Sequence, residues 1–399
     1  MTATEIGGVK KKMKQGGING ELMNRDMVVG KIRDGVVEII DIDHAPLFFR
    51  RSRYIEPWLE KRAIDEHRTH SRLLKRILRL TKKDDVSTSL RVHGATLTDP
   101  YWVKLQGENL KYENIRFRTD DFADLALRGD MEVFSQELDE LDSHTPELTN
   151  IGSFEKCWRV ENGSWWMYKK GDDLSIFSEC FVERLGKKLG FPMANYIPSA
   201  PGVIKSKDFT DGCRVIYEPM EYLIGERYDD YSLNYHELLE LSADCAKQYL
   251  DILYLDAICR NPDRHEFNYG ILRDLETGKV ISMAPNFDNN LALFSNGIPK
   301  MLDRSNDFLI RELYDFLEKE NIDYEIPIFN SNDLDEIINE IPIVVDNDSV
   351  KQFVLNGQNK MLEWQTQNLK RLDKKIVKAM KGQKEHMENR KNRGPKMER

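Results

Sequence analysis

The sequence predicts a bilobal α+β fold, in which a β-rich N-terminal lobe is followed by a helical C-terminal lobe. Three observations lead to this prediction. With 399 residues, of which 40% are hydrophobic and 10% aromatic, the chain can bury a sizeable core and is long enough for two lobes. Short strand-like segments, separated by one helical segment, occupy the middle of the chain. After Tyr235, apolar residues recur at helical spacing.

Composition and charge exclude several classes of protein. The 59 basic and 68 acidic residues give a formal net charge of -9, which argues against direct nucleic-acid binding, where a basic surface is usual. No apolar run approaches the roughly 18 residues that cross a bilayer, and the N-terminus lacks a continuous apolar segment for secretion. We therefore expect a cytoplasmic protein that does not bind membranes.

Cysteine and histidine usage gives no sign of a metal centre. The five cysteines are scattered without a C-x-x-C pair, so neither a disulfide framework nor a zinc knuckle is indicated. His67 and His70 lie three residues apart on an expected helix, but no third ligand is near them in the sequence. A solvated helix face explains both histidines.

The N-terminal part is expected to begin with a flexible tail, residues 1–26, which is rich in Gly, Lys and polar residues. Residues 27–144 form an α+β extension of the N-terminal lobe. The segment "MVVGKIRDGVVEIIDID" predicts a hairpin that turns at "RDG". From Ile55 to about Lys83, apolar spacing predicts a helix whose other face is basic and solvated.

Residues 145–222 are expected to form the core of the N-terminal lobe. The segment "FEKCWRVENGSWWMYKKG" predicts two strands joined at "NG", because both of those residues tolerate positive φ. A helix is predicted from Ser175 to Gly190, and the strand in "CRVIYEPMEYL" is expected to end at Pro219.

Residues 223–385 are expected to form the helical C-terminal lobe, with a basic tail at 386–399. One long apolar helix is predicted from Tyr235 to Ile258. The polar stretch "NPDRHEFNYGIL" follows directly, and the alternating segment "VISMAPNFDNNLAL" comes next. A polar stretch between two apolar segments indicates either a solvated turn or a loop whose side chains meet a ligand.

Two residues of this stretch, Asp263 and Asn268, have the D-x-x-x-x-N spacing of a phosphoryl-transfer loop. In such a loop the aspartate accepts the proton of the substrate hydroxyl, and the asparagine holds a magnesium ion. The spacing alone is weak evidence, since both residue types are common in turns. Asp288, at the end of "MAPNFD", could provide a second ligand, because magnesium prefers hard oxygen atoms shared with ATP phosphates.

Binding of ATP also requires a phosphate-binding loop, a lysine and a carboxylate that holds this lysine. Candidates for these three parts occur in this order upstream of Asp263. Gly152 and Ser153 lie in "ELTNIGSFEKCW", although one glycine is a poor match to a G-x-G-x-x-G loop. Lys169 ends the next strand, and Glu179 lies on the following helix. Lys170 competes with Lys169 for the same role. Both lysines could instead end a strand in water, and Glu179 could be an exposed helix residue.

Taken together, these segments resemble the HipA-like family of bacterial serine/threonine kinases, from about Val92 to Phe294. "GSFEKCW" resembles the family's phosphate-loop segment, "MYKKG" its lysine strand, without the usual proline, and "SECFVERLGKKLG" its glutamate helix. "NPDRHEFNYGIL" is similar to its N-x-D-x-H-x-x-N catalytic loop, and "MAPNFD" to its A-P-x-x-D metal segment. The resemblance implies a protein-kinase-like fold and Mg²⁺-dependent transfer of the ATP γ-phosphoryl group to Ser or Thr of a protein substrate.

The resemblance also implies roles for individual residues, with Lys169 paired to Glu179 and backbone groups near Glu218 and Met220 facing adenine. The implied site residues are Asp263, His265 and Asn268 for catalysis, Asn268 and Asp288 for magnesium, and Gly152, Ser153, Lys169, Glu179, Glu218 and Met220 for ATP. Autophosphorylation of Thr149 or Ser153 would add negative charge that repels ATP and would switch the kinase off.

The sequence is also compatible with other acceptors and with another class of protein. "DRHEFN" also resembles the catalytic loop of phosphatidylinositol kinases, so the acceptor could be a lipid or another small molecule. A nucleotide-binding pseudokinase, acting as a scaffold or a DNA-associated regulator, is a candidate of a different class. Toxins of the HipA-like family work with a DNA-binding antitoxin, which implies an antitoxin-like partner and a toxin-like role.

Overall fold

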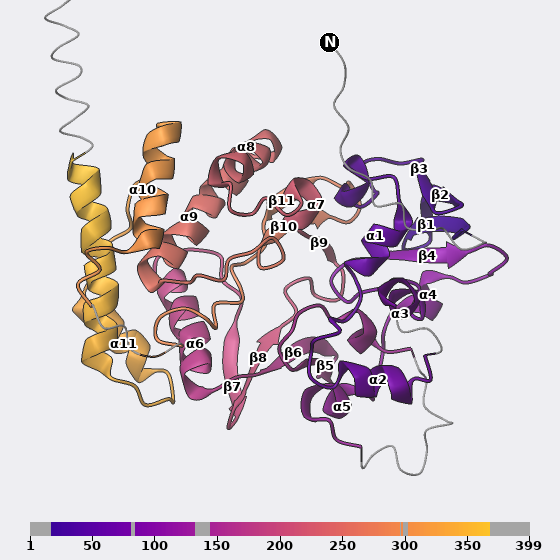
Figure 1. Ribbon diagram of the computed structural model, residues 1–399, viewed down its shortest axis with the longest axis horizontal. Coiled ribbons are helices and arrows are strands. Elements are labelled where there is room, and N and C mark those ends of the chain that lie inside the picture. The colour runs from indigo at the N-terminus through magenta and orange to yellow at the C-terminus, as the bar shows by residue number, and fades with distance from the viewer. Residues whose placement is uncertain (1–16, 81–83, 132–143, 296, 298–301, 368–399) are drawn as a thin grey trace, which may run out of the picture.

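The computed structural model describes residues 17–80, 84–131, 144–295, 297 and 302–367. Figure 1 shows the N-terminal sheet and its short helices at one end of the molecule, and the long helices of the C-terminal lobe at the other. Two further sheets, one of four strands and one of three, lie between them. The predicted α+β architecture, with a strand-rich N-terminal part and a helical C-terminal part, is confirmed.

The first sheet contains four antiparallel strands in the order β3-β2-β1-β4. The strands are β1 (Gly20–Asn24), β2 (Met27–Arg33), β3 (Val36–Ile39) and β4 (Tyr101–Leu105). The hairpin predicted at "RDG" is confirmed as the turn between β2 and β3. The tail predicted for residues 1–26 is wrong over β1, because Leu22 and Met23 are buried and the strand bonds to neighbours on both sides. Residues 1–16 lie outside the described residues.

Short helices follow β3 and β4 in the chain. They are a 3-10 helix (Leu47–Arg50), α1 (Ile55–Glu60), α2 (Ser71–Ile77), α3 (Asp85–Leu90), α4 (Tyr112–Ile115) and α5 (Ala123–Arg128). The single helix predicted from Ile55 is therefore wrong: it ends at Glu60 and a new helix starts at Ser71. The intervening residues 61–70, here called turn 61–70, contain two arginines whose buried side chains bond to distant backbone carbonyls. Such tertiary contacts outweigh the helical spacing of the apolar residues.

The second sheet has the order β5-β6-β8-β7. Its strands are β5 (Lys156–Glu161), β6 (Ser164–Lys170), β7 (Tyr196–Ala200) and β8 (Val203–Lys207), and a 3-10 helix (Pro146–Thr149) precedes them. The predicted hairpin at "NG" is confirmed by the pairing of Glu161 with Ser164. Helix α6 (Asp173–Lys188) starts two residues before the predicted Ser175, because the Asp172 side chain caps it by accepting the Ser175 N–H at 2.8 Å.

The third sheet connects the two lobes. It has the order β11-β10-β9, with β9 (Val215–Pro219), β10 (Gly270–Asp274) and β11 (Val280–Met283). The strand predicted to end at Pro219 does so, and α7 (Glu221–Ile224) follows. Because β9 and β10 are neighbours, the chain before α7 and the polar stretch after the long helix meet at one sheet.

The C-terminal lobe consists of helices α8 (Tyr231–Leu241), α9 (Ala243–Cys259), α10 (Phe308–Glu320), α11 (Ser331–Asn339) and a helix that begins at residue 347. The long helix predicted from Tyr235 to Ile258 is interrupted. Ser242 is extended, with φ of -167°, and its hydroxyl accepts the N–H of Asp244, so that it ends α8 and caps α9. The predicted tail at 386–399 lies outside the described residues.

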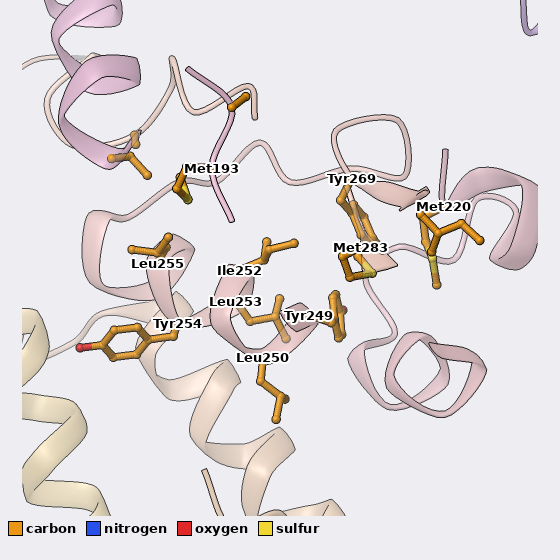
Figure 2. Packing of buried hydrophobic residues seen from close by; sticks show 14 of the residues in the cluster. Met193, Met220, Tyr249, Leu250, Ile252, Leu253, Tyr254, Leu255, Tyr269 and Met283 are labelled. Atoms are coloured by element: carbon orange, nitrogen blue, oxygen red, sulfur yellow. The ribbon is translucent and has the colours of Figure 1, made fainter. Parts of the chain in front are cut away.

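Helix α9 is the centre of the main hydrophobic core. Figure 2 shows Tyr249 beside Met283 and Tyr269 of the third sheet region. The rings of Tyr249 and Tyr269 stack with centroids 5.7 Å apart. Burial of each large apolar side chain stabilises the fold by about 1.5–3 kcal/mol, which holds the end of α9 against the third sheet. Among the residues that the structure describes, no helix is both long and apolar enough to span a bilayer.

Candidate active site

A cavity of about 620 Å³ lies where the second sheet, the end of β9, the stretch after α9 and the N-terminal extension meet. Eight of the residues singled out in the sequence line it: Thr149, Gly152, Ser153, Lys169, Asp263, His265, Asn268 and Asp288. Glu179 lies directly behind Lys169 and contacts it. Residues from four separate parts of the sequence therefore surround one space.

Lys169 is the central cation of this cavity. Its ammonium group forms an ion pair with Asp288 and a second contact, of 3.4 Å, with Glu179 Oε1. Glu179 on α6 is 1% exposed, and its other oxygen accepts the N–H of Asn289 at 2.7 Å. The side chains of Lys169 and Glu179 are both buried, so the alternative that they are exposed to solvent is wrong for both. Lys170 points elsewhere and does not line the cavity.

Burial and the neighbouring charges both shift the pKa values of the carboxyl groups in this cluster. Burial raises the pKa of Glu179 to about 7, although the neighbouring Lys169 ammonium acts in the opposite direction. Burial acts in the same way on Asp288, but the ammonium groups of Lys169 and Lys156 outweigh it and lower the pKa of Asp288 to about 2. The Asp288 carboxylate is therefore ionised at neutral pH.

Asp288 owes its position to an uncommon backbone conformation. Its φ is 61°, in the left-handed region that few non-glycine residues occupy, and its N–H donates to Tyr196 Oη of β7 at 3.0 Å. Non-glycine residues in this region cost roughly 1–3 kcal/mol and are frequent at functional sites. The segment "MAPNFD" thus leaves β11 and turns its final carboxylate into the cavity.

The stretch after α9 forms a closed loop. Asn268 donates from Nδ2 to the backbone oxygen of Asp263 at 2.8 Å, and its N–H donates to the backbone oxygen of His265 at 2.8 Å. The Asn268 amide oxygen is thereby left for another partner. The ring of His265 accepts the N–H of Phe267 through Nδ1 at 3.3 Å, so this side chain helps to hold the shape of the loop. Burial raises the pKa of Asp263.

Arg264 explains how this loop and the "MAPNFD" segment are joined. Its guanidinium forms two hydrogen bonds to Asp256 of α9, at 2.8 and 2.9 Å. It also donates to the backbone oxygens of Asn268 and Phe287, at 2.7 and 2.9 Å. Arg264 therefore holds the segment of Asp263 and Asn268 against the segment of Asp288, a role that the sequence did not reveal.

Two predicted residues, Glu218 and Met220, do not line the cavity. The side chain of Glu218 pairs with Arg273 at 2.6 Å, and the N–H of Met220 donates to the backbone oxygen of Tyr269 at 2.9 Å. Successive side chains of a strand point to opposite faces, so Tyr217 and Pro219 face the cavity instead. The alternation in the sequence places Tyr217 and Pro219 on one face, but only the tertiary structure shows that this face borders the cavity.

An aromatic group at this end of the cavity was not predicted. Phe209, Tyr217 and Phe287 all line it and contact one another, with ring centroids between 5.4 and 5.9 Å apart. They lie far apart in the sequence, so no local pattern brings them together. Aromatic rings that are only half-buried offer flat surfaces on which a planar ligand can stack.

The residues between the 3-10 helix and β5, here called loop 150–155, form part of the border of the cavity. Gly152 has a φ of 111°, which residues other than glycine rarely adopt, and the ammonium group of Lys156 lies directly against it. Lys156 also lines the cavity, and burial lowers its pKa to about 8. Within the described chain Lys156 forms no ion pair.

The two candidate modification sites differ in accessibility. Thr149 is buried, and its hydroxyl donates to the backbone oxygen of Ala95 at 2.6 Å. Ser153 in loop 150–155 is exposed. Both line the cavity, but only Ser153 is accessible without breaking a contact to the extension.

Solved structures of other proteins are similar in fold to this chain. The structure is similar to that of HipA from Shewanella oneidensis MR-1, solved with HipB and operator DNA, with a TM-score of 0.50 and 14% sequence identity over 87% of this chain and 97% of that chain. It is also similar to the proinflammatory kinase CtkA of Helicobacter pylori, with a TM-score of 0.42 and 16% identity over 54% of this chain and 92% of that chain. No protein-family model and no curated protein matches the sequence. The chain therefore has a HipA-like kinase fold.

Proposed function

We propose that the protein is an ATP- and magnesium-dependent kinase that transfers the γ-phosphoryl group to Ser or Thr of a protein substrate. The observation that carries this proposal is the convergence of Lys169, Asp263 and Asp288 on one cavity. Phosphoryl transfer needs mainly positioning and charge stabilisation, and these three side chains provide a cation for phosphates, a base and a metal ligand.

Two groups of lining residues differ in chemistry and would bind different parts of ATP. Phe209, Tyr217 and Phe287 form an apolar surface suited to the adenine ring. Lys169 and Lys156 lie near loop 150–155 and are suited to the phosphates. Glu179 holds Lys169 in place without itself lining the cavity.

The oxygen atoms near Asp263 fit magnesium. The described residues contain no cluster of three or more His, Cys, Asp or Glu side chains that could hold a metal. Magnesium, however, is commonly held by only one or two protein oxygens together with substrate phosphates. The ionised carboxylate of Asp288 and the free amide oxygen of Asn268 are such a pair. When bound, magnesium would neutralise charge that develops on the phosphoryl group.

Asp263 is the residue we assign as base for the substrate hydroxyl. Its backbone is held by Asn268, and its side chain lines the cavity. Replacing Asp263 with Asn keeps the shape and removes the proton acceptor, so we expect transfer of labelled phosphate to protein to fall by about 100-fold or more. Asp315→Asn, on the exposed face of α10, is the matched control and is expected to retain activity.

The acceptor is tested in the same experiment. Wild-type protein is incubated with labelled ATP and either a cell extract or phosphatidylinositol vesicles. Labelled protein that depends on Asp263 supports a protein kinase, whereas labelled lipid alone identifies a lipid kinase. Equal labelling by wild type and Asp263→Asn contradicts the catalytic assignment, whereas no labelling by either protein supports the pseudokinase alternative.

Autophosphorylation is proposed for the hydroxyls beside the cavity. Since Ser153 is exposed and Thr149 is buried against Ala95, we expect phosphate to appear first on Ser153 and more slowly on Thr149. Mass spectrometry after timed incubation with ATP measures both. Phosphate on neither residue would contradict regulation through this loop.

A protein partner is also part of the proposal. The HipA structure similar to this chain contains HipB and operator DNA. We propose by analogy that a DNA-binding, antitoxin-like protein binds this chain and limits its activity. Co-expression with a HipB-like protein, followed by copurification and the labelling assay, tests this.

A further inference from the structure

The N-terminal extension holds the chain at the entry to loop 150–155 through three consecutive residues. The N–H of Ile64 donates to the backbone oxygen of Leu148 at 2.8 Å. The hydroxyl of Thr149 donates to the backbone oxygen of Ala95, and Arg68 Nη1 donates to the backbone oxygen of Asn150 at 3.0 Å. The last of these contacts is made by Asn150, the first residue of loop 150–155.

Glu147 connects the entry of this loop to its exit. One carboxylate oxygen accepts the side-chain N–H of Asn150 at 3.1 Å, on the entry side. The other accepts the backbone N–H of Trp158 at 2.6 Å, in the strand that follows the loop. A single buried carboxylate therefore holds the two sides of the loop together at its base.

Arg68 is the cation that faces this carboxylate. Its side chain is fully buried, and Nη2 lies 3.5 Å from Glu147 Oε2. Within the described residues, Nε and Nη2 have no hydrogen-bond partner, so the carbonyl of Asn150 is the only hydrogen-bond acceptor of this guanidinium. A buried ion pair with unsatisfied donors gives little net stability. Stabilising the fold is therefore a poor explanation of Arg68, whereas its bond to the loop entry is specific.

We propose that Arg68 and Glu147 clamp the base of loop 150–155, so that the N-terminal extension holds this loop in the form that binds ATP. Arg68 is then a positioning residue that acts through Asn150 and Glu147. The proposal rests on the proposed kinase function for its effect on ATP, but the clamp itself is a property of the protein without nucleotide.

The test removes both charges together, since removing one would leave the other buried and unpaired. In the variant with Arg68→Met and Glu147→Gln we expect the KM for ATP to rise about tenfold, with kcat changed less than about twofold, because binding alone is weakened. Without nucleotide, we expect amide hydrogen exchange in residues 150–156 to be at least about tenfold faster. Arg72→Met, at an exposed position of α2, is the control and is expected to match wild type.

Two results would overturn the clamp: wild-type exchange in loop 150–155 of the double variant, or an unchanged KM together with a lower melting temperature. If the double variant fails to fold, Arg68→Lys is measured instead, because it keeps a charge beside Glu147 but lacks the planar guanidinium. Wild-type exchange and KM in Arg68→Lys would also overturn the proposal. If wild-type protein does not bind ATP, the proposed function fails, while the exchange measurement still decides on the clamp.

Discussion

At the scale of single residues, the site depends on a small group of opposite charges held close together. Lys169 contacts both Glu179 and Asp288, and burial alone would neutralise either carboxyl group. The ammonium group keeps Asp288 ionised, while Glu179 has its pKa raised to about 7. Two carboxyl groups that share one lysine therefore differ in acidity, and the more acidic one is better suited to hold a metal ion.

Lys156 leads to a prediction about pH. Its pKa is lowered to about 8, so it is charged at pH 7 and loses its charge as the pH rises through 8. If it binds ATP phosphates, kcat/KM for ATP falls above about pH 8, since this ratio reports groups of the free enzyme. Lys156→Arg stays charged and is expected to lose this decline. A decline of equal size in both proteins would show that another group is responsible.

At the scale of elements, the ends of two helices and the contacts between two loops determine where the site residues lie. Asp172 caps α6, which carries Glu179, and the backbone at Arg260 ends α9 with a φ of 53° before the loop of Asp263. Arg264 then joins that loop to the segment of Asp288. The start of α6 and the end of α9 thus set the positions of Glu179 and of the Asp263 loop, and the buried Arg264 aligns that loop with the segment of Asp288.

The cap of α6 provides a prediction about stability. Asp172→Ala removes the acceptor for the Ser175 N–H and is expected to destabilise the protein by about 1 kcal/mol. Because Glu179 lies almost two turns further along the helix, we expect KM for ATP to change little. Urea unfolding measures the first effect and a kinase assay the second. Asp173→Ala, which leaves this cap in place, is the control.

At the scale of the whole molecule, the extension and the lobes behave as one packed structure. Arg273 of β10 is 1% exposed and donates to the backbone oxygen of Ala45, to Tyr101 Oη and to Glu218 Oε2, at 3.0, 3.1 and 2.6 Å. Together with the contacts to loop 150–155, this makes the extension a structural part of the site.

This arrangement predicts how the molecule responds to loss of Arg273. Arg273→Met leaves the carboxylate of Glu218 buried without its partner, which is expected to cost about 3–5 kcal/mol. Adding Glu218→Gln is expected to recover much of this loss, because a neutral amide is less costly to bury. Equilibrium unfolding in urea measures both variants. A single variant as stable as wild type would contradict the importance of this contact.

The sequence by itself determined the α+β class, both hairpins, the end of β9 at Pro219 and most of the residues around the cavity. Those features depend on local spacing, on turn residues and on short motifs, all of which act over a few positions of the chain. Only the tertiary structure decided that Lys169 rather than Lys170 faces the cavity, that Tyr217 and Pro219 replace Glu218 and Met220, and that β1 is a strand. It also decided the roles of Arg68 and Arg264, because the role of a buried charged side chain depends on the residues that it contacts, and these are distant in the sequence.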